Sequence, residues 1–192
     1  MYETDRIKLV PFNREFLENE VTGYKRWFLN PLVTAQNSHG LFPKSEAEYE
    51  MFLESIDIAE AIVFAILVKQ GDEIPAYVHI GNVSLQGFNW IYRSAEFAVV
   101  LGEPDFWGKG YCTEATELLL KHGFGKLNLH RIWSGTASTN VGMQRVFDKL
   151  GFQEEGIFND GMFLNGRYVD ICCYYLLDWQ WSDFFQKKGR VN

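Results

Sequence analysis

The sequence has little cysteine and little histidine, and this weighs against disulfide-rich and metal-binding proteins. Its 192 residues include three cysteines and four histidines. The cysteine number is odd, and Cys172 and Cys173 are adjacent, so the chain shows neither a disulfide framework nor a C-x-x-C metal pair. The histidines are scattered without the spacing of metal ligands. We therefore expect no metal site.

Long hydrophobic runs and an excess of basic residues are also missing. No apolar stretch approaches the roughly 20 residues of a membrane-spanning helix, and residues 1–6 lack the apolar region of a secretory signal. The formal net charge is −7, whereas nucleic-acid binding needs clustered Lys and Arg to neutralise phosphates. We expect a cytoplasmic protein with no membrane partner and no nucleic-acid partner.

The composition is that of an ordinary globular protein, with 47% hydrophobic and 22% charged residues. No internal repeat, low-complexity tract or linker divides the chain, so residues 1–192 are expected to form a single domain. Hydrophobic periodicity predicts strands at 6–11, 61–69, 77–85, 95–101, 131–137, 152–158 and 168–177. It predicts helices at 14–29, at 43–58 with a Ser45–Glu48 capping box, after residue 110, and at 141–150. The fold class is therefore α/β with a mixed sheet.

The most informative segment, Asp105 to Ala115, joins the end of an apolar strand to the start of an amphipathic helix. Gly108 and Gly110 lie at the junction, where a backbone can approach a ligand closely. A helix start offers unpaired N–H groups and the positive end of the helix dipole. The segment is therefore suited to hold a phosphate group.

Spacing separates this segment from two common phosphate loops. A nucleoside-triphosphate loop needs four residues between its first glycine and Gly-Lys, but five separate Gly102 from Gly108. A dinucleotide-binding loop needs a third glycine where Thr113 stands. A tight strand-to-helix turn without a ligand stays open as the alternative.

Several motifs, in order along the chain, resemble the GCN5-related N-acetyltransferase (GNAT) superfamily and, more narrowly, its RimJ/RimL-type branch. The segment from Trp107 to Ala115 resembles the acetyl-CoA pyrophosphate loop of that branch. The similarity begins at the first expected strand and continues to the last one. The other matching segments are Thr4 to Pro11, Leu129 to Ile132, Asn140, Lys149 to Phe152, Glu155 to Gly156 and Asn165 to Asp170.

The resemblance implies a fold and an activity. The fold is a single GNAT-like domain with a central, mixed, mostly antiparallel twisted sheet flanked by helices, in which two strands splay to form the acetyl-CoA cleft. The activity is transfer of an acetyl group from acetyl-CoA, the cosubstrate, to a primary amine by direct attack. We expect a small-molecule amine or aminosugar as acceptor. The alternatives are a peptide acceptor, as in protein N-terminal acetyltransferases, and a non-catalytic acyl-CoA-binding regulatory module.

The resemblance also implies the residues that meet acetyl-CoA. Amides near Val99 and Val100 would bind the oxyanion, and Leu101 would pair with the pantetheine arm like an added strand. Asn140 is expected both to cap its helix and to contact CoA. The implied loop contacts are Trp107, Gly108, Lys109, Gly110, Tyr111, Cys112 and Thr113.

Glu96 is the expected general base or the start of a water relay. An alkylamine with a pKa of about 10 must lose a proton before it attacks, and a Glu inside the apolar run 95–100 is unusual. A structural hydrogen bond or an exposed strand face is the alternative.

Phe147 occupies the position, on the cofactor side of the site, where many members of the superfamily have a tyrosine. That tyrosine protonates the CoA thiolate, and a phenyl ring cannot do so. Ser138, Tyr111 and Cys112 are the remaining candidate donors.

The expected amine pocket contains Trp27, Tyr168 and Asp170 together with Glu96. Core packing is the alternative for the aromatic residues, and a local pair with Arg167 is the alternative for Asp170. The pocket has further aromatic candidates. These are Phe28, Phe42, Trp90, Tyr92 and Tyr174. We also expect the aromatic tail at 179–185 to cover a partner subunit, which would make a homodimer.

Overall fold

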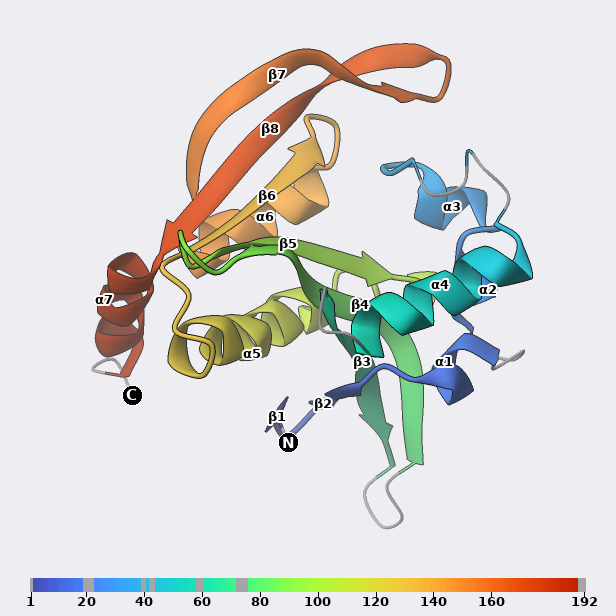
Figure 1. The fold of residues 1–192 in the computed structure, drawn as a ribbon, viewed down its shortest axis with the longest axis horizontal. Helices are drawn as coiled ribbons and strands as arrows, with labels where there is room; N and C mark the ends of the chain where they lie inside the picture. Colours follow the sequence, from blue (N-terminus) through green and yellow to red (C-terminus); the bar gives the residue numbers. More distant parts are fainter. Residues whose placement is uncertain are drawn as a thin grey trace.

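One twisted sheet forms the centre of the computed structural model (Figure 1), which describes residues 2–18, 23–38, 41, 44–57, 61–71 and 76–189. Among these residues the sheet has eight strands in the order β1-β2-β3-β4-β5-β6-β8-β7. The strands are β1 Tyr2–Glu3, β2 Ile7–Pro11, β3 Ala61–Gln70, β4 Ala76–Asn89, β5 Ser94–Leu101, β6 Arg131–Ala137, β7 Gln153–Leu164 and β8 Arg167–Leu177. All neighbours are antiparallel except β5 and β6, which are parallel. The predicted mixed, mostly antiparallel sheet is confirmed.

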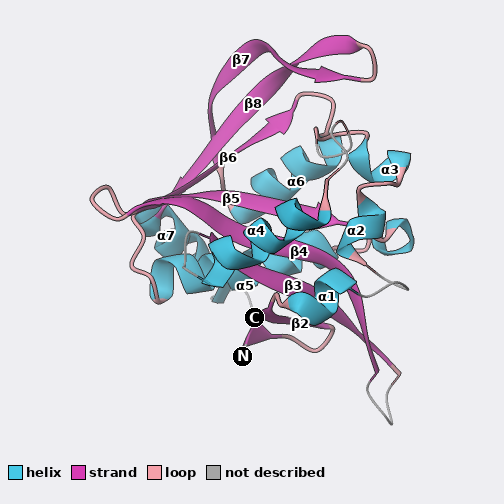
Figure 2. Ribbon diagram, turned by 45° about the vertical axis from the view of Figure 1, so that its right-hand side comes forward, coloured by secondary structure: helices cyan, strands magenta, loops and turns pink. Residues whose placement is uncertain are grey.

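Helices cover both faces of the sheet (Figures 1 and 2). The helices are α1 Arg14–Glu18, α2 Tyr24–Trp27, α3 Pro31–Thr34, α4 Glu46–Asp57, α5 Tyr111–Gly125, α6 Val141–Leu150 and α7 Asp178–Gly189, with a 3-10 turn at Pro104–Phe106. Strand β3 shows why two layers of helices are needed. Val63, Ala65 and Leu67 are buried with α1, α2 and α4, whereas the alternate residues Phe64 and Ile66 are buried with α5 and α6. The sheet therefore separates two hydrophobic cores.

The first predicted helix, at 14–29, is wrong as one continuous element. Its described parts are the short helices α1 and α2, and Gly23, just before α2, has an extended backbone with φ −130° and ψ 143°. Glycine loses more conformational freedom in a helix than any other residue, which favours a break at this point.

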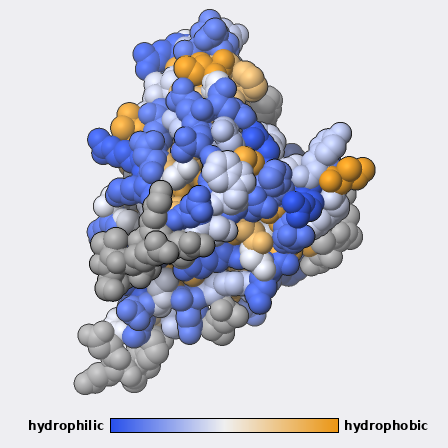
Figure 3. All heavy atoms as spheres, turned by 90° about the vertical axis from the view of Figure 1, so that its left-hand side faces the viewer, coloured by the Kyte–Doolittle hydropathy of each residue, from blue (hydrophilic) through white to orange (hydrophobic). Residues whose placement is uncertain are grey.

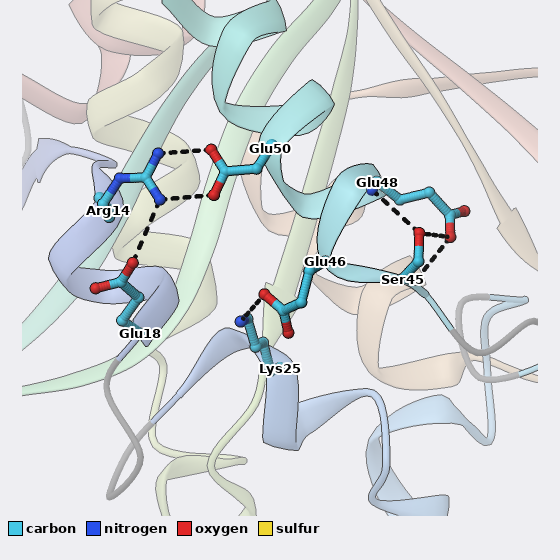
Figure 4. Close-up of polar contacts among 7 residues, drawn as sticks. All are labelled: Arg14, Glu18, Lys25, Ser45, Glu46, Glu48 and Glu50. Carbon is cyan, nitrogen blue, oxygen red and sulfur yellow. Dashed lines mark hydrogen bonds and ion pairs between the residues drawn. The ribbon is translucent and has the colours of Figure 1, made fainter.

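The capping box predicted at the start of α4 is confirmed. The backbone N–H of Glu48 donates to Ser45 Oγ at 3.3 Å, and the backbone N–H of Ser45 donates to Glu48 Oε2 at 2.7 Å (Figure 4). On the same helix Glu50 accepts two hydrogen bonds of 2.6 Å from Arg14 of α1. These contacts fix α4 at its first turn and along its side.

The C-terminal aromatic tail forms helix α7, which the sequence patterns did not predict. Trp181 is buried in the core beside α5, with its ring 6.1 Å from the ring of Phe124. Phe184 stacks on Trp181 at 6.0 Å. These two rings therefore cover the chain's own core, while Trp179 is exposed, and coverage of a partner subunit by the tail stays a prediction.

One face of the molecule is mostly hydrophilic (Figure 3). On the face shown in Figure 3 hydrophilic residues predominate, and hydrophobic residues gather in small separate patches. Within the described part of the chain, no helix is long and apolar enough to cross a membrane. The same residues contain no group of three or more His, Cys, Asp or Glu side chains that could hold a metal ion.

Candidate active site

The site lies where the two parallel strands separate. Strand β5 pairs with β6 only through Ser94, Ala95 and Glu96, which lie opposite Arg131 to Trp133. Beyond Glu96 the strands diverge and leave a cavity of about 630 Å³ between them. Val99, Val100 and Leu101 line this cavity, as expected from the splayed strands. The predicted cleft between splayed strands is confirmed.

The loop before α5 forms one wall of the cavity through its backbone. Gly108 and Gly110 have φ values of 71° and 87°, in the left-handed region that side chains other than glycine rarely adopt. Gly110 is the N-cap of α5, and no side chain caps this helix start. The N–H groups of the first turn, at residues 111–113, therefore remain for a ligand. The loop residues on the wall are Trp107, Gly108, Gly110, Tyr111, Cys112 and Thr113.

Two of the predicted loop contacts serve other purposes as well. Trp107 Nε1 donates to the carbonyl oxygen of Leu101 at 3.0 Å, so this ring ties the loop to the end of β5. Lys109 is not on the cavity wall, and its carbonyl oxygen accepts a hydrogen bond of 3.1 Å from Arg6. Lys109 thus contacts Arg6 through its carbonyl oxygen, and its contact with the cofactor stays a prediction.

Asn140 stands at the start of α6 and lines the cavity. Its side-chain Oδ1 accepts a hydrogen bond of 3.1 Å from the backbone N–H of Met143, which is the expected N-cap. The side-chain amide N–H groups are not used by this cap. Asn140 can therefore cap the helix and donate to a ligand in the cavity.

Glu96 occupies the last paired position before β5 and β6 diverge. Its side chain is half-buried, lines the cavity and accepts a hydrogen bond of 3.2 Å from Gln86 Nε2 on the neighbouring strand β4. Among the described residues that line the cavity, Glu96 is the only acidic one. A carboxylate here can take a proton from an amine that approaches the end of the cavity, while Gln86 holds it in place.

Phe147 does not contact the cavity, which corrects its expected place in the cofactor site. Its side chain has 0% exposure and stacks on Tyr174, with ring centres 4.6 Å apart. Phe97 and Phe152 complete its surroundings. Phe147 is a core residue because the apolar face of α6 packs against the sheet at this point.

The predicted proton donors differ in position. Ser138 is not on the cavity wall, and its backbone N–H donates to the carbonyl oxygen of Asp170 at 2.8 Å. Cys112 does line the cavity, but burial raises the pKa of its thiol to about 12. That value is far above the pKa of about 8.5 for an ordinary thiol, so proton transfer from Cys112 to a CoA thiolate is unfavourable. Tyr111 lines the cavity at the start of α5.

Three predicted acceptor residues lie away from the cavity. Trp27 is only 2% exposed, and its Nε1 donates to Glu103 Oε1 at 2.8 Å inside the core beside α2. Tyr168 is 65% exposed and packs edge-on against Phe163 in the β7–β8 hairpin. Asp170 uses Oδ1 to accept a hydrogen bond from a backbone N–H of that hairpin, at Asp160. None of the three side chains lines the cavity, because Trp27 packs in the core and Tyr168 and Asp170 belong to the β7–β8 hairpin. Their roles toward the acceptor stay predictions.

The other aromatic candidates also lie outside the cavity wall. Phe28 is buried with α2, and Tyr174 is buried against Phe147. Trp90 and Tyr92 are exposed at the turn between β4 and β5. Phe42 lies outside the described residues.

Other cavity residues were not predicted from the sequence. Gln36 and Asn37 follow α3, and Met162 comes from β7. Arg145 and Lys149 lie on α6, on the same side of the helix one turn apart, and bring basic groups to the cavity. The spacing of four residues between these two basic residues was a usable signal, whereas nothing in the sequence connects α3 or β7 with the cavity.

Hydrogen bonds hold the segment after α3 across from β6 and β8. Thr139 Oγ1 donates to Gln36 Oε1 at 2.7 Å, and Asn165 Nδ2 donates to the carbonyl oxygen of Ala35 at 3.2 Å. The segment that carries Gln36 is thereby attached to the start of α6 and to the β7–β8 turn. Gln36, Asn37 and Ser38 of this segment also line the cavity.

Comparison with known proteins places this geometry in a family. Residues 6–153 match the model of the acetyltransferase (GNAT) domain. Spermidine N(1)-acetyltransferase of Vibrio cholerae is 38% identical over 98 residues, which are 51% of this chain and 56% of that protein. Spermidine N(1)-acetyltransferase of Escherichia coli is 28% identical over 181 residues, which are 88% of this chain and 86% of that protein.

A solved structure shows the same likeness over nearly the whole length. It is the spermidine N-acetyltransferase from Vibrio cholerae in complex with CoA and spermine, with a TM-score of 0.79 and 25% identity. The match covers 93% of this chain and 99% of that one. Since the family model spans more than half of the sequence, and its expected cleft and phosphate loop are both present, the chain belongs to the GNAT acetyltransferases.

Proposed function

We propose that this chain transfers the acetyl group of acetyl-CoA to a primary amine of a small molecule. One observation carries the proposal: β5 and β6 diverge between a helix start with free amides and a single carboxylate, Glu96. The first supplies a site for a pyrophosphate, and the second supplies a proton acceptor. The pyrophosphate site and the proton acceptor therefore lie in one cavity.

Separate groups of residues bind acetyl-CoA, stabilise the oxyanion and take the proton. The amides at 111–113 bind the pyrophosphate, and the free edge of β5 at Leu101 pairs with the pantetheine arm. Amides near Val99 and Val100 stabilise the oxyanion that forms when the amine attacks the thioester carbonyl. Glu96 takes the amine proton, directly or through a water molecule. The C–S bond then breaks and CoA leaves as the thiolate.

The leaving thiolate needs little help from an acid. Its conjugate thiol has a pKa of about 8.5, close to neutrality, so the ammonium proton of the intermediate or solvent can protonate it. Phe147 cannot donate, and its place in the core leaves no space for a donor there. Tyr111 lies at the start of α5, where the pyrophosphate is proposed to bind, and the pantetheine arm separates that position from the sulfur. The ammonium proton or solvent is therefore the acid that we propose for this step.

A small amine suits the acceptor side of the cavity. The segment at 36–38 lines the cavity and is attached to Thr139 by a hydrogen bond, and Glu96 offers one negative charge to a cationic substrate. Both spermidine acetyltransferases described above act on a polyamine, so polyamines are the first acceptors to test. Amino sugars come next. A peptide acceptor, the RimJ/RimL-type branch and a homodimer stay predictions.

The acceptor is tested by mass spectrometry of acetylated products from a pooled library of polyamines, amino sugars and peptides. Release of free CoA thiol together with an acetylated small amine is the expected result. Acetyl-CoA binding without thiol release across the whole library would instead indicate a non-catalytic binding module. Acetylated peptides alone would identify an N-terminal acetyltransferase.

The Glu96→Gln variant tests the general base. Loss of the proton acceptor should lower kcat by about 10²–10⁴-fold near pH 7, and the loss should shrink at high pH, where more of the amine is already neutral. Glu155→Gln is the matched control, since Glu155 is an exposed carboxylate on β7 that pairs with Arg131 outside the cavity. A loss that is equal at both pH values would assign Glu96 a structural role.

A further inference from the structure

Arg6 lies against the phosphate loop although it is 108 residues distant from Glu114 in the sequence. The carbonyl oxygen of Arg6 accepts a hydrogen bond of 2.9 Å from the N–H of Lys69, which fixes its backbone beside the end of β3. Its Nη1 donates to the carbonyl oxygen of Lys109 at 3.1 Å, and its Nε donates to Glu114 Oε2 at 2.9 Å. The guanidinium carbon also lies 4.7 Å from the centre of the Tyr111 ring. One side chain therefore contacts three residues of the loop and helix start.

The contact with Glu114 matters for electrostatics. Glu114 lies in the first turn of α5, whose amides are the proposed pyrophosphate site. A carboxylate at this end of a helix stabilises the helix dipole, but it repels a bound diphosphate. In the structure both oxygens of Glu114 are occupied: Arg6 donates to Oε2 through Nε and Nη2, and the hydroxyl of Thr4 donates to Oε1. The negative charge is thus compensated where it would oppose the cosubstrate.

We infer that Arg6 is a positioning residue for acetyl-CoA, because it masks the charge of Glu114 from the pyrophosphate. Arg6 is not part of the cavity wall and acts through Glu114. The inference rests on the proposed function, because it takes the start of α5 as the pyrophosphate site. It adds a residue from the turn between β1 and β2 to a site otherwise built mainly from β5, β6, α5, α6 and the segment after α3.

The test compares Arg6→Ala, Glu114→Gln and the double variant. Arg6→Ala should weaken CoA binding about tenfold in calorimetry at low salt, the size expected for one uncompensated charge near a diphosphate. The KM for acetyl-CoA should rise by a similar factor, with kcat within about twofold of wild type. The double variant should return to within about threefold of the wild-type Kd, because the unmasked charge is gone. At about 1 M salt, where the Debye length is about 3 Å, the loss in Arg6→Ala should largely disappear.

Arg14→Ala is the matched control. Arg14 also makes a two-pronged pair with a glutamate, Glu50, and its side chain is 54% exposed, compared with 49% for Arg6 (Figure 4). Arg14 does not line the cavity, so its variant should bind CoA as the wild type does. If Arg6→Ala does not fold, as judged by thermal unfolding, Arg6→Gln replaces it in the same comparisons.

Three results would overturn the inference: an unchanged Kd in Arg6→Ala, a double variant as weak as Arg6→Ala, or a loss that salt does not reduce. Failure of the proposed function looks different. In that case the wild-type protein itself would neither bind CoA nor release thiol from acetyl-CoA.

Discussion

Replacing Gly110 by alanine isolates the backbone requirement of the phosphate loop. Gly110 has φ 87° and ψ −3°, a left-handed conformation that a residue with a Cβ adopts at a cost. A Cβ built on this glycine would have Arg6 Nη2 as its nearest neighbour at 3.5 Å, which is an ordinary contact. The variant therefore suffers from backbone strain and not from a collision.

The size of this strain is about 1–2 kcal/mol. If the loop keeps its shape, the strain lowers the free energy of unfolding, and the melting temperature of a protein of this size falls by about 2–4 °C per kcal/mol. If the loop relaxes instead, its amides lose their alignment, and the same energy appears as a CoA affinity about 5–30-fold weaker. The decrease in unfolding free energy and the decrease in CoA binding free energy should together equal the strain energy.

Thermal unfolding and calorimetric titration with CoA measure the two losses. Gly125→Ala is the control, because Gly125 ends the same helix without a positive φ, and a Cβ added there would meet no atom within 4 Å. Alanine at such a position stabilises a helix by about 0.5–1 kcal/mol. The reasoning is refuted if Gly110→Ala binds CoA with the wild-type Kd and melts no lower than Gly125→Ala.

Two further predictions concern buried residues. Phe147→Tyr should place a hydroxyl in a packed core beside Tyr174. The free energy of unfolding measured in urea should fall by about 1–3 kcal/mol, and kcat should not rise. A faster enzyme would show that Phe147 does not lie in the core as described. Burial lowers the pKa of His79, so this side chain stays neutral in the folded protein. In the unfolded chain it binds a proton below about pH 6.5. The free energy of unfolding therefore decreases as the pH falls. His79→Gln should therefore lose less unfolding free energy than the wild type between about pH 7.5 and about pH 5.5, and an equal loss would contradict this account.

Local patterns were sufficient for most of the secondary structure. Strand β6 and helix α6 have the predicted bounds, because each combines clear periodicity with a turn or cap at its ends. The sequence did not reveal the break at Gly23, since helical periodicity continues on both sides of it. Helix α7 was missed because its aromatic residues resemble an exposed tail until a core is present to bury Trp181.

The sequence by itself determined the donor side of the site. The two glycines, their spacing and the helix that follows are neighbours in the chain, so local geometry specifies a loop with free amides. Glu96 was also identified locally, as a carboxylate in an apolar strand.

The tertiary structure decided which distant residues join that site. It placed Trp27, Tyr168 and Asp170 elsewhere and brought Gln36, Met162 and Arg6 to the cavity or its loop. These positions depend on the divergence of β5 from β6 and on how the helices and the β7–β8 hairpin pack around it. Such contacts join residues far apart in the sequence, and no local pattern encodes them.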